Sequence, residues 1–309
     1  NNVTLGYQAA YFPTGSNNVW VGYKAGYGAS ATNAYSNTVV GYEALMAVTT
    51  GYENIAIGRA AATNVTTANR NIFIGRSAGS AVTTTSEFNI IIGSGSVSAN
   101  DVGNSNVFVG GGNNAKAALA ETVGIGQSAL AGVSGNSNTA VGFSAGSSTD
   151  TAAEITVVGH GALRTVTGNS NTAIGKGVMG DGTGGGASNT GVGARALQGV
   201  STGGSNTSVG AGALQTISTH SSNTAVGKSA GYKTTTSYNT FVGSHAAEKA
   251  AGGSGHNTFV GYAAGRGDND DAAGFSGSHN TVMGSQALGD ALLASSNRNV
   301  ILGYQAAYE

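Results

Sequence analysis

One short pattern of polar and apolar positions recurs eighteen times along the chain. Each copy has an Asn, three residues of strand character, a Gly and, three places after that Gly, usually an Ala, as residues 138–145 illustrate. Successive glycines are mostly 16 to 18 residues apart. A short period that fills a whole chain is typical of a solenoid or a fibre. We therefore predict an all-β fold, a parallel β-roll of about 18 coils of about 17 residues, forming one continuous repeat domain over residues 1–309.

The glycine of each copy serves as its marker, and the three residues before it are interpreted as one strand. The last strand residue is apolar in all eighteen copies, so we predict that this column is buried. The first strand residue is mostly Val or Ile in the early copies and is Thr in every copy from Thr139 to Thr281. Because residues two apart share a face of a strand, we expect Thr139 and Val141 in the core. The marker glycines are Gly6, Gly22, Gly41, Gly58, Gly75, Gly93, Gly110, Gly126, Gly142, Gly159, Gly175, Gly193, Gly210, Gly227, Gly243, Gly261, Gly284 and Gly303.

The middle residue of each strand is also apolar in most copies, with Trp20, Phe73 and Phe108 among them. An ordinary surface strand would carry a polar residue there, whereas a strand that is apolar on both faces is covered on both faces. The coil itself can cover one face. We expect a symmetry-related copy of the chain to cover the other, because each coil has few apolar side chains of its own to bury. The pattern therefore predicts an oligomer in which the threonine column faces inward.

Turn chemistry explains the Asn and the Gly of each copy. Asn tolerates unusual backbone angles, and stacked Asn amides form ladders between coils, so we expect Asn138 in the core. The Asn position departs from Asn only at Thr122 and Ile155. Gly142 would supply a sharp bend, and Ala145 would allow close packing after it. The stretches between copies, rich in Gly, Ser, Thr and Asn, are predicted to form turns and short second strands.

Composition narrows the class of protein. Charged residues make up only 9% of the chain and the net charge is −1, so there is no basic cluster for nucleic acid. Cysteine is absent, which excludes disulfides and thiolate metal sites. No apolar run approaches the roughly 18 residues that span a bilayer, and we expect no membrane insertion by this segment. Because the chain opens on Asn1 inside a repeat, we expect a processed or excerpted part of a longer protein.

The phrase Asn-Thr-Ala-Val-Gly-x-x-Ala at 138–145 resembles the head repeat of trimeric autotransporter adhesins of the YadA-like type, Ser-Val-Ala-Ile-Gly-x-x-Ala. It is also similar to the repeats of bacteriophage tail-fibre shafts. The resemblance covers essentially the whole chain. It implies an intertwined, left-handed homotrimer of β-rolls around a common axis, and a role in attachment to surfaces. The period near 17 residues is longer than that family's coil, so longer turns are expected here.

Several short motifs look like catalytic or cofactor sites but are better explained by the repeat. The hydrolase motif Gly-x-Ser-x-Gly occurs at 75–79, 142–146 and 227–231, each time as the repeat's own Gly-x-x-Ala-Gly. The dinucleotide fingerprint at 175–180 has neither a helix nor an acidic partner after it. We therefore predict no enzyme activity and no cofactor.

Two clusters could suggest a metal. His256 and His279 both precede the Asn position in adjacent coils, which would place them roughly 5 Å apart. Asp268, Asp270 and Asp271 lie in the longest insertion, but their spacing lacks the remaining ligands of a calcium-binding EF-hand loop. We interpret the histidines as exposed turn residues and predict no metal site.

Two groups of residues are candidates for surface recognition. The position after the marker glycine often carries a large side chain, and in register these would form a column able to bind sugars or the next molecule by stacking and cation–π contacts. The alternative is that the column only shields the coil edge, with its polar ends in water. The longest insertion contains Arg266, Gly267 and Asp268, a tripeptide by which some ligands engage integrins. The candidates in the column are Tyr7, Tyr23, Tyr42, Arg59 and Arg76.

These patterns predict a non-enzymatic, extracellular structural fibre, the shaft of an adhesin or of a phage tail fibre on a cell surface or virion. Its expected partners are copies of itself, as a homotrimer or higher polymer, together with surface glycans or a host receptor. One alternative is a monomeric ice-binding β-solenoid, which requires the column from Thr139 to Thr281 to face water. Another is a subunit of a self-assembling filament, because residues 2–10 nearly repeat at 299–307.

Overall fold

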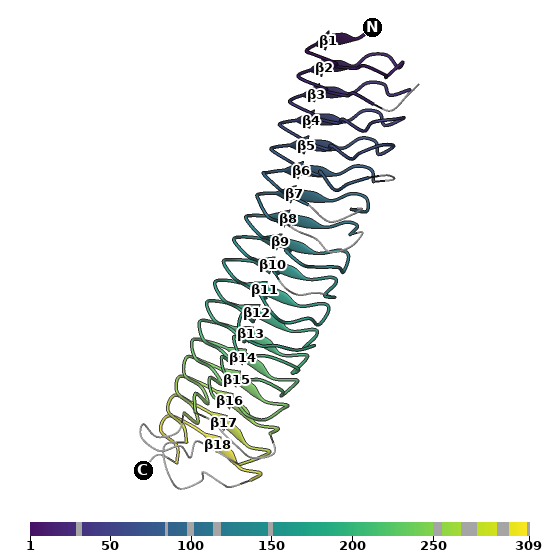
Figure 1. Cartoon of the computed structure of the whole chain (residues 1–309). Coiled ribbons are helices and arrows are strands. Elements are labelled where there is room, and N and C mark those ends of the chain that lie inside the picture. Colours follow the sequence, from purple (N-terminus) through teal and green to yellow (C-terminus); the bar gives the residue numbers. More distant parts are fainter. Residues whose placement is uncertain are drawn as a thin grey trace. The chain divides into compact units, whose positions relative to one another are not determined.

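Each repeat forms one coil of a parallel β-solenoid in the computed structural model (Figure 1). The chain divides into two compact units, Asn1–Glu154 and Ile155–Glu309. Every coil contributes one three-residue strand, and the described residues include no α-helix, so the predicted all-β solenoid of about 18 coils is confirmed. The structure describes residues 1–28, 33–83, 86–97, 102–113, 119–147, 151–249, 255–266, 277–288 and 297–307.

Each unit contains nine strands that pair in parallel with the strands of neighbouring coils. The strands of the first unit are β1 (Val3–Leu5), β2 (Val19–Val21), β3 (Thr38–Val40), β4 (Ile55–Ile57), β5 (Ile72–Ile74), β6 (Ile90–Ile92), β7 (Val107–Val109), β8 (Val123–Ile125) and β9 (Thr139–Val141). The strands of the second unit are β10 (Thr156–Val158), β11 (Thr172–Ile174), β12 (Thr190–Val192), β13 (Thr207–Val209), β14 (Thr224–Val226), β15 (Thr240–Val242), β16 (Thr258–Val260), β17 (Thr281–Met283) and β18 (Val300–Leu302).

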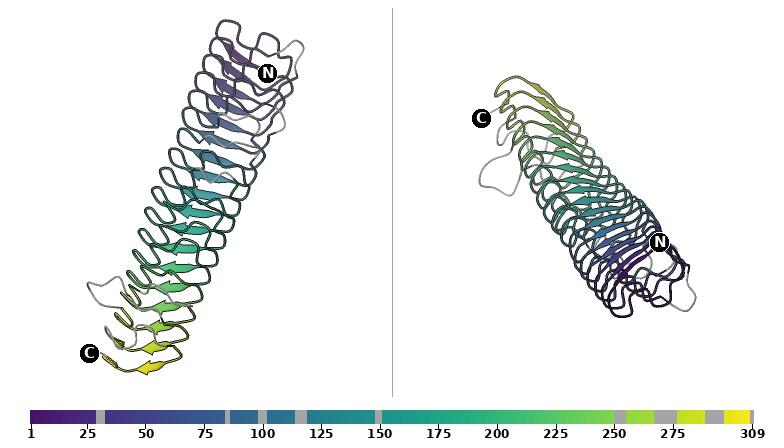
Figure 2. Two further views of the ribbon diagram at one scale, coloured as in Figure 1. Left: turned by 60° about the horizontal axis from the view of Figure 1, so that its bottom comes forward. Right: turned by 90° about the horizontal axis from the view of Figure 1, so that it is seen from above.

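Equivalent residues of successive coils stack in register. Phe73 of β5 lies opposite Ile91 of β6, with the flanking residues aligned in the same way. The longest step of the repeat joins β16 to β17, yet Phe259 still pairs with Val282. The strands of each unit therefore keep one alignment although the steps between them differ in length (Figure 2).

Only the middle residue of each strand points into its own coil. Trp20, Phe73 and Phe108 are fully buried, whereas the residues on either side of each are partly exposed. Neighbouring side chains of a strand point to opposite faces, so a three-residue strand whose centre faces inward turns its two ends outward. The prediction that the residue before the marker glycine is buried is therefore wrong for the single chain.

Three positions after the marker glycine complete the interior of the coil. They follow the glycine by three, four and seven residues, and in the coil of β4 they are Ala61, Ala62 and Val65, all fully buried. The last two positions lie in stretches that resemble ordinary polar turns in the sequence. The buried column at seven residues includes Val48, Val65, Val82, Val133, Val166, Val200 and Ile217.

In several coils the size of the middle strand residue is balanced by the residue four places after the marker glycine. Trp20 shares its coil with Gly26, where an added Cβ would lie 2.0 Å from the indole ring. In the coil of β12 the middle residue is Gly191, and the fully buried Leu197 occupies the position four places after the glycine. Interiors are close-packed, so a large side chain at one position requires a small one at the other.

The marker glycines make the bend that the sequence predicts. All eighteen have φ between 123° and 147°, a backbone conformation that residues with a Cβ rarely adopt. They also stack closely, since a Cβ at Gly75 would lie 2.7 Å from the carbonyl oxygen of Gly93 in the next coil. Glycine is therefore required at this position both by the dihedral angle and by the approach of the next coil.

The segments between repeats are turns, and the predicted second strands do not form in the described residues. Outside the named strands the described residues form isolated bridges at most, among them Asn69 with Glu87 and Val166 with Gly184. Backbone hydrogen bonds still link these turns from coil to coil, as from Thr66 N–H to the Thr83 carbonyl at 2.8 Å.

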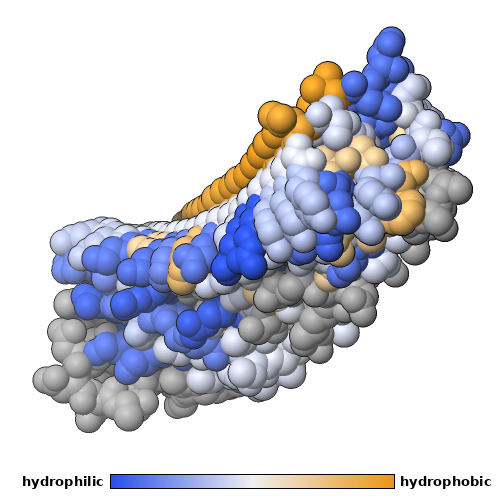
Figure 3. All heavy atoms as spheres, turned by 45° about the horizontal axis from the view of Figure 1, so that its top comes forward, coloured by the Kyte–Doolittle hydropathy of each residue, from blue (hydrophilic) through white to orange (hydrophobic). Residues whose placement is uncertain are grey.

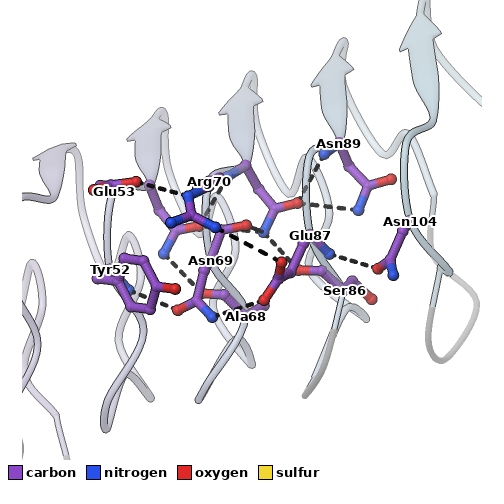
Figure 4. A network of polar contacts seen from close by, with 11 residues as sticks. Tyr52, Glu53, Ala68, Asn69, Arg70, Ser86, Glu87, Asn89 and Asn104 are labelled. Carbon is purple, nitrogen blue, oxygen red and sulfur yellow. Dashed lines mark hydrogen bonds and ion pairs between the residues drawn. The ribbon is translucent and has the colours of Figure 1, made fainter.

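A buried ladder of asparagines runs along each unit, as predicted. Asn71 is representative: its side-chain amide donates to the Asn54 Oδ1 at 3.2 Å and to the Ser86 carbonyl at 2.8 Å. Its own Oδ1 accepts the backbone N–H of Asn89 at 2.9 Å (Figure 4). The ladder weakens after Thr122, whose hydroxyl is 3.5 Å from the next N–H, that of Asn138. Asn138 is fully buried, as expected.

Candidate interaction surfaces

The outward side of the strands is an apolar surface, which we call the outer face and define as the first and last residues of every strand. The last residues form an unbroken aliphatic or Met column within each unit, and Val40, Ile57 and Val209 are each 38% exposed. Thr139 and Val141, expected in the core, lie on the outer face and are half-buried. The reason is the inward turn of the residue between them.

The outer face differs in chemistry between the two units. In the first unit the first strand residues are Val or Ile except at Thr38 and Thr139, so the face is aliphatic in both columns. In the second unit the first strand residue is Thr in every strand except β18, and Thr156 and Thr207 are exposed. The prediction that the threonine column faces inward is therefore wrong for the single chain, and the methyl and hydroxyl groups of these side chains lie beside an aliphatic column.

Figure 3 shows a row of hydrophobic side chains lying open on the surface. A face three residues wide and nine strands long measures roughly 10 Å by 40 Å in each unit, or about 400 Å². A contiguous apolar patch of this size matches the largest patch of a typical monomer, which is often functional. The outer face is thus a regular apolar feature that the coil itself leaves uncovered.

The column after the marker glycine forms a stack of side chains, as predicted. The rings of Tyr7 and Tyr23 lie 5.6 Å apart at 14°, and those of Tyr23 and Tyr42 lie 4.9 Å apart at 12°. The Arg59 guanidinium continues the stack 5.8 Å from the Tyr42 ring centre. Arg76 follows in the same column and is exposed.

This stacking limits how the tyrosines can bind a ligand. Tyr23 has a tyrosine on each ring face, and Tyr42 lies between Tyr23 and Arg59, so neither ring has a free face for a sugar. The carboxylate of the neighbouring Glu43 raises the pKa of the Tyr42 phenol. The geometry favours the alternative in which this part of the column shields the coil edge.

A charged cluster that sequence reasoning did not single out lies on the turns of β4 to β6. Arg70 donates to Glu53 at 2.9 Å and lies 4.0 Å from Glu87 (Figure 4). Its guanidinium is 5.2 Å from the Tyr52 ring and 5.3 Å from the Phe88 ring. The hydrogen bond to the Glu53 carboxylate raises the pKa of Arg70. The groups satisfy one another along the stack, so the cluster links coils and leaves no open site.

Of the integrin-type tripeptide, the structure describes Arg266 alone. Its guanidinium donates to the Glu248 carboxylate at 2.8 Å, and Glu248 also lies 3.0 Å from His245 Nδ1. Gly267 and Asp268 lie outside the described residues, as do Asp270 and Asp271. The arginine is thus tied to the preceding coil.

The two histidines stack as expected. The rings of His256 and His279 are 4.9 Å apart at 14°, and Tyr238 stacks on His256 at 4.9 Å. Parallel rings direct their nitrogen lone pairs side by side, whereas ligands of one metal must converge on it. No group of three or more His, Cys, Asp or Glu that could hold a metal occurs among the described residues.

The three Gly-x-Ser-x-Gly motifs share the geometry of the repeat. Ser77, Ser144 and Ser229 all have φ between 51° and 56°, in the turn that follows the marker glycine. Non-serine residues at the same position, such as Lys24 and Glu43, have the same conformation. The motif is therefore the turn of the coil and not a strand-to-helix elbow.

A polar notch in the second unit was also missed. It has a volume of about 600 Å³ and lies between the turns of β11 to β14, beside Lys176, Arg195, Gln198 and Gln215. The available signal was Ala194 followed by Ala211, two small residues in succession at a position that is mostly large, and Ser94 with Gly111 is a second such pair.

The described part of the chain has no helix long and apolar enough to cross a membrane. Comparisons with models of protein families, with curated proteins and with solved structures found no match.

Proposed function

We propose that the chain is a non-enzymatic structural module of an extracellular fibre, of the adhesin or phage tail-fibre shaft kind, that associates as a homotrimer through its outer face. The observation that carries the proposal is the unbroken apolar last column of the strands, which stays half-exposed in the single chain. Apolar patches of this kind are often functional. The resemblance of the repeat to adhesin heads agrees with this, and attachment to a surface would be the role of the assembled shaft.

Charge placed on the outer face tests the proposal. The double variant Ile57→Lys, Ile125→Lys puts two ammonium groups on half-exposed positions of β4 and β8. A single coil can hold these side chains in water, but a covered face cannot do so without the cost of burying a charge. We expect the mass in solution, measured by light scattering, to fall from the trimer to the single chain.

The matched control is Gln127→Lys, two residues after Ile125 in the same coil, where the side chain is exposed and lies off the outer face. This control should keep the mass of the parent protein. If the double variant and the control behave alike, the outer face is not the interface. A mass that grows with concentration beyond the trimer would favour the filament alternative.

One observation favours a second candidate, the ice-binding solenoid. The threonine column of the second unit points outward, and Thr156 and Thr207 are exposed. Thermal hysteresis of the purified protein measures this activity directly. A monomer whose hysteresis is lost on Thr207→Tyr would favour ice binding, and a trimer without hysteresis would favour the fibre.

A further inference from the structure

The post-glycine column of the second unit contains a gap. It contains Lys176 in the coil of β11, Ala194 and Ala211 in the next two coils, and Lys228 in the coil of β14. At about 4.8 Å per coil, the two lysines are placed roughly 14 Å apart along the column. The two alanines leave the notch of about 600 Å³ between them open.

The walls of this notch are polar. Lys176 and Arg195 line it, and among the described residues neither is within ion-pair distance of a carboxylate. Gln215 donates to the Gln198 Oε1 at 2.9 Å, which fixes both amides as one wall. Gln198 in turn donates to the Asp181 carboxylate. Asp181 lines a second, smaller cavity of about 310 Å³, which shares Gln198 and Gln215 with the notch.

These groups select a ligand class. Two exposed cations favour an anion, and the amides of Gln198 and Gln215 each keep one N–H and acceptor capacity on Oε1 for hydroxyl groups. No aromatic side chain lines the notch, so it offers no stacking platform for nucleobases. Its volume is within the range of about 300 to 1,000 Å³ of small-ligand sites and exceeds what a single inorganic anion needs.

We propose that this notch binds an acidic saccharide chain, with Lys176 and Arg195 facing its carboxylate or sulfate groups and Gln198 and Gln215 facing its hydroxyls. The inference extends the attachment role of the proposed fibre by naming a ligand class and a place for it. It does not depend on the outer face, because the notch is built from one chain.

Titration calorimetry with the full chain tests the proposal. The probes are an oligogalacturonate, which carries carboxylates, a dextran sulfate, which carries sulfates, and neutral dextran. We expect saturable binding of at least one acidic probe and none of neutral dextran, and the tighter acidic probe identifies the preferred group. The double variant Lys176→Gln, Arg195→Gln should weaken that binding at least tenfold.

Filling the notch gives an independent variant. Ala211→Tyr places a tyrosine where the column carries one naturally at Tyr23 and Tyr42, and it should also weaken binding at least tenfold. The control Arg164→Gln, Lys233→Gln removes two exposed cations of the second unit that do not line the notch, and it should change the affinity less than twofold. If Ala211→Tyr fails to fold, as judged by circular dichroism, the two charge variants decide.

Three results would overturn the proposal: no saturable binding of either acidic probe, equal loss in the control variant, or tighter binding of single-stranded RNA than of both saccharides. The mass of each sample is measured in parallel. A trimer that does not bind saccharide contradicts only the notch, whereas a monomer that binds it contradicts only the proposed assembly.

Discussion

At the scale of the residue, the stability of the repeat depends on one polar side chain in each coil. Asn71 is fully buried and makes hydrogen bonds to the coils on both sides. Each buried donor or acceptor left without a partner costs about 1 to 3 kcal/mol. The asparagine column is therefore structural. It recurs because each asparagine supplies hydrogen-bond partners to buried backbone groups of the adjacent coils.

Replacing Asn71 with Ala should destabilise the first unit by about 2 to 4 kcal/mol, since the Asn89 N–H and the Ser86 carbonyl lose their partner. Urea unfolding followed by circular dichroism measures the change. The control is Asn64→Ala, an exposed asparagine with a single contact to the Ser80 carbonyl, which should cost about 0.5 kcal/mol or less. Equal losses in the two variants would contradict the ladder.

The converse change should stabilise the protein. At Thr122 the ladder has a hydroxyl that is 3.5 Å from the Asn138 N–H, and an asparagine there would restore a normal acceptor and two donors. Thr122→Asn is expected to add about 1 kcal/mol of stability, seen as a higher urea midpoint. A lower midpoint would show that this coil cannot accept the ladder geometry.

At the scale of the element, each coil is a small packing unit in which sizes are matched. The coil of β5 pairs Phe73 with Gly79, where an added Cβ would lie 2.3 Å from the Phe73 ring. The preceding coil pairs Ala56 with Ala62, and Ala62 has φ of 51°, close to the 60° of Gly79. Alanine is thus acceptable in this conformation, and the clash is with the ring.

A double-mutant cycle follows from this comparison. Gly79→Ala alone should destabilise through overpacking, by about 1 to 3 kcal/mol, and Phe73→Ala alone by about 3 to 5 kcal/mol through the cavity. The double variant recreates the pair of the neighbouring coil, so its cost should be less than the sum by at least about 1 kcal/mol. Strictly additive urea midpoints would disprove the size matching.

The comparison of sequence and structure is clearest at this scale. The period, the glycine bend and the asparagine ladder were predictable because each is a single residue type repeated for one physical reason. Which strand side chains face inward was not predictable. The strand residues are mostly apolar on both faces, so alternation alone does not show which face lies inside. Val65 and its column escaped notice since they sit in stretches of Thr, Ser and Gly whose turn conformations vary.

Candidate sites divide in the same way. The stack of Tyr7, Tyr23 and Tyr42 and the pairing of His256 with His279 followed directly from register. The notch beside Arg195 did not follow from register. It forms because Ala194 and Ala211 are small residues at a position that carries a large side chain in most coils. The many positive φ angles were not predicted either. The turns impose them on residues such as Phe88, whose type gives no indication of a left-handed backbone conformation.

At the scale of the whole molecule, the outer face connects the fold to the proposed function. Thr139, Val141 and their equivalents are turned outward because the coil interior is already filled by the middle strand residue and the turn. Their apolar surface has no partner within the coil. In the proposed trimer, other copies of the chain supply that partner.

The most direct test of this assembly is the mass of the unmodified protein in solution, measured by light scattering or sedimentation equilibrium over a wide range of concentration. The account predicts a discrete species of three times the 30.1 kDa chain, stable on dilution. A monodisperse species of 30.1 kDa that persists at high concentration would contradict it.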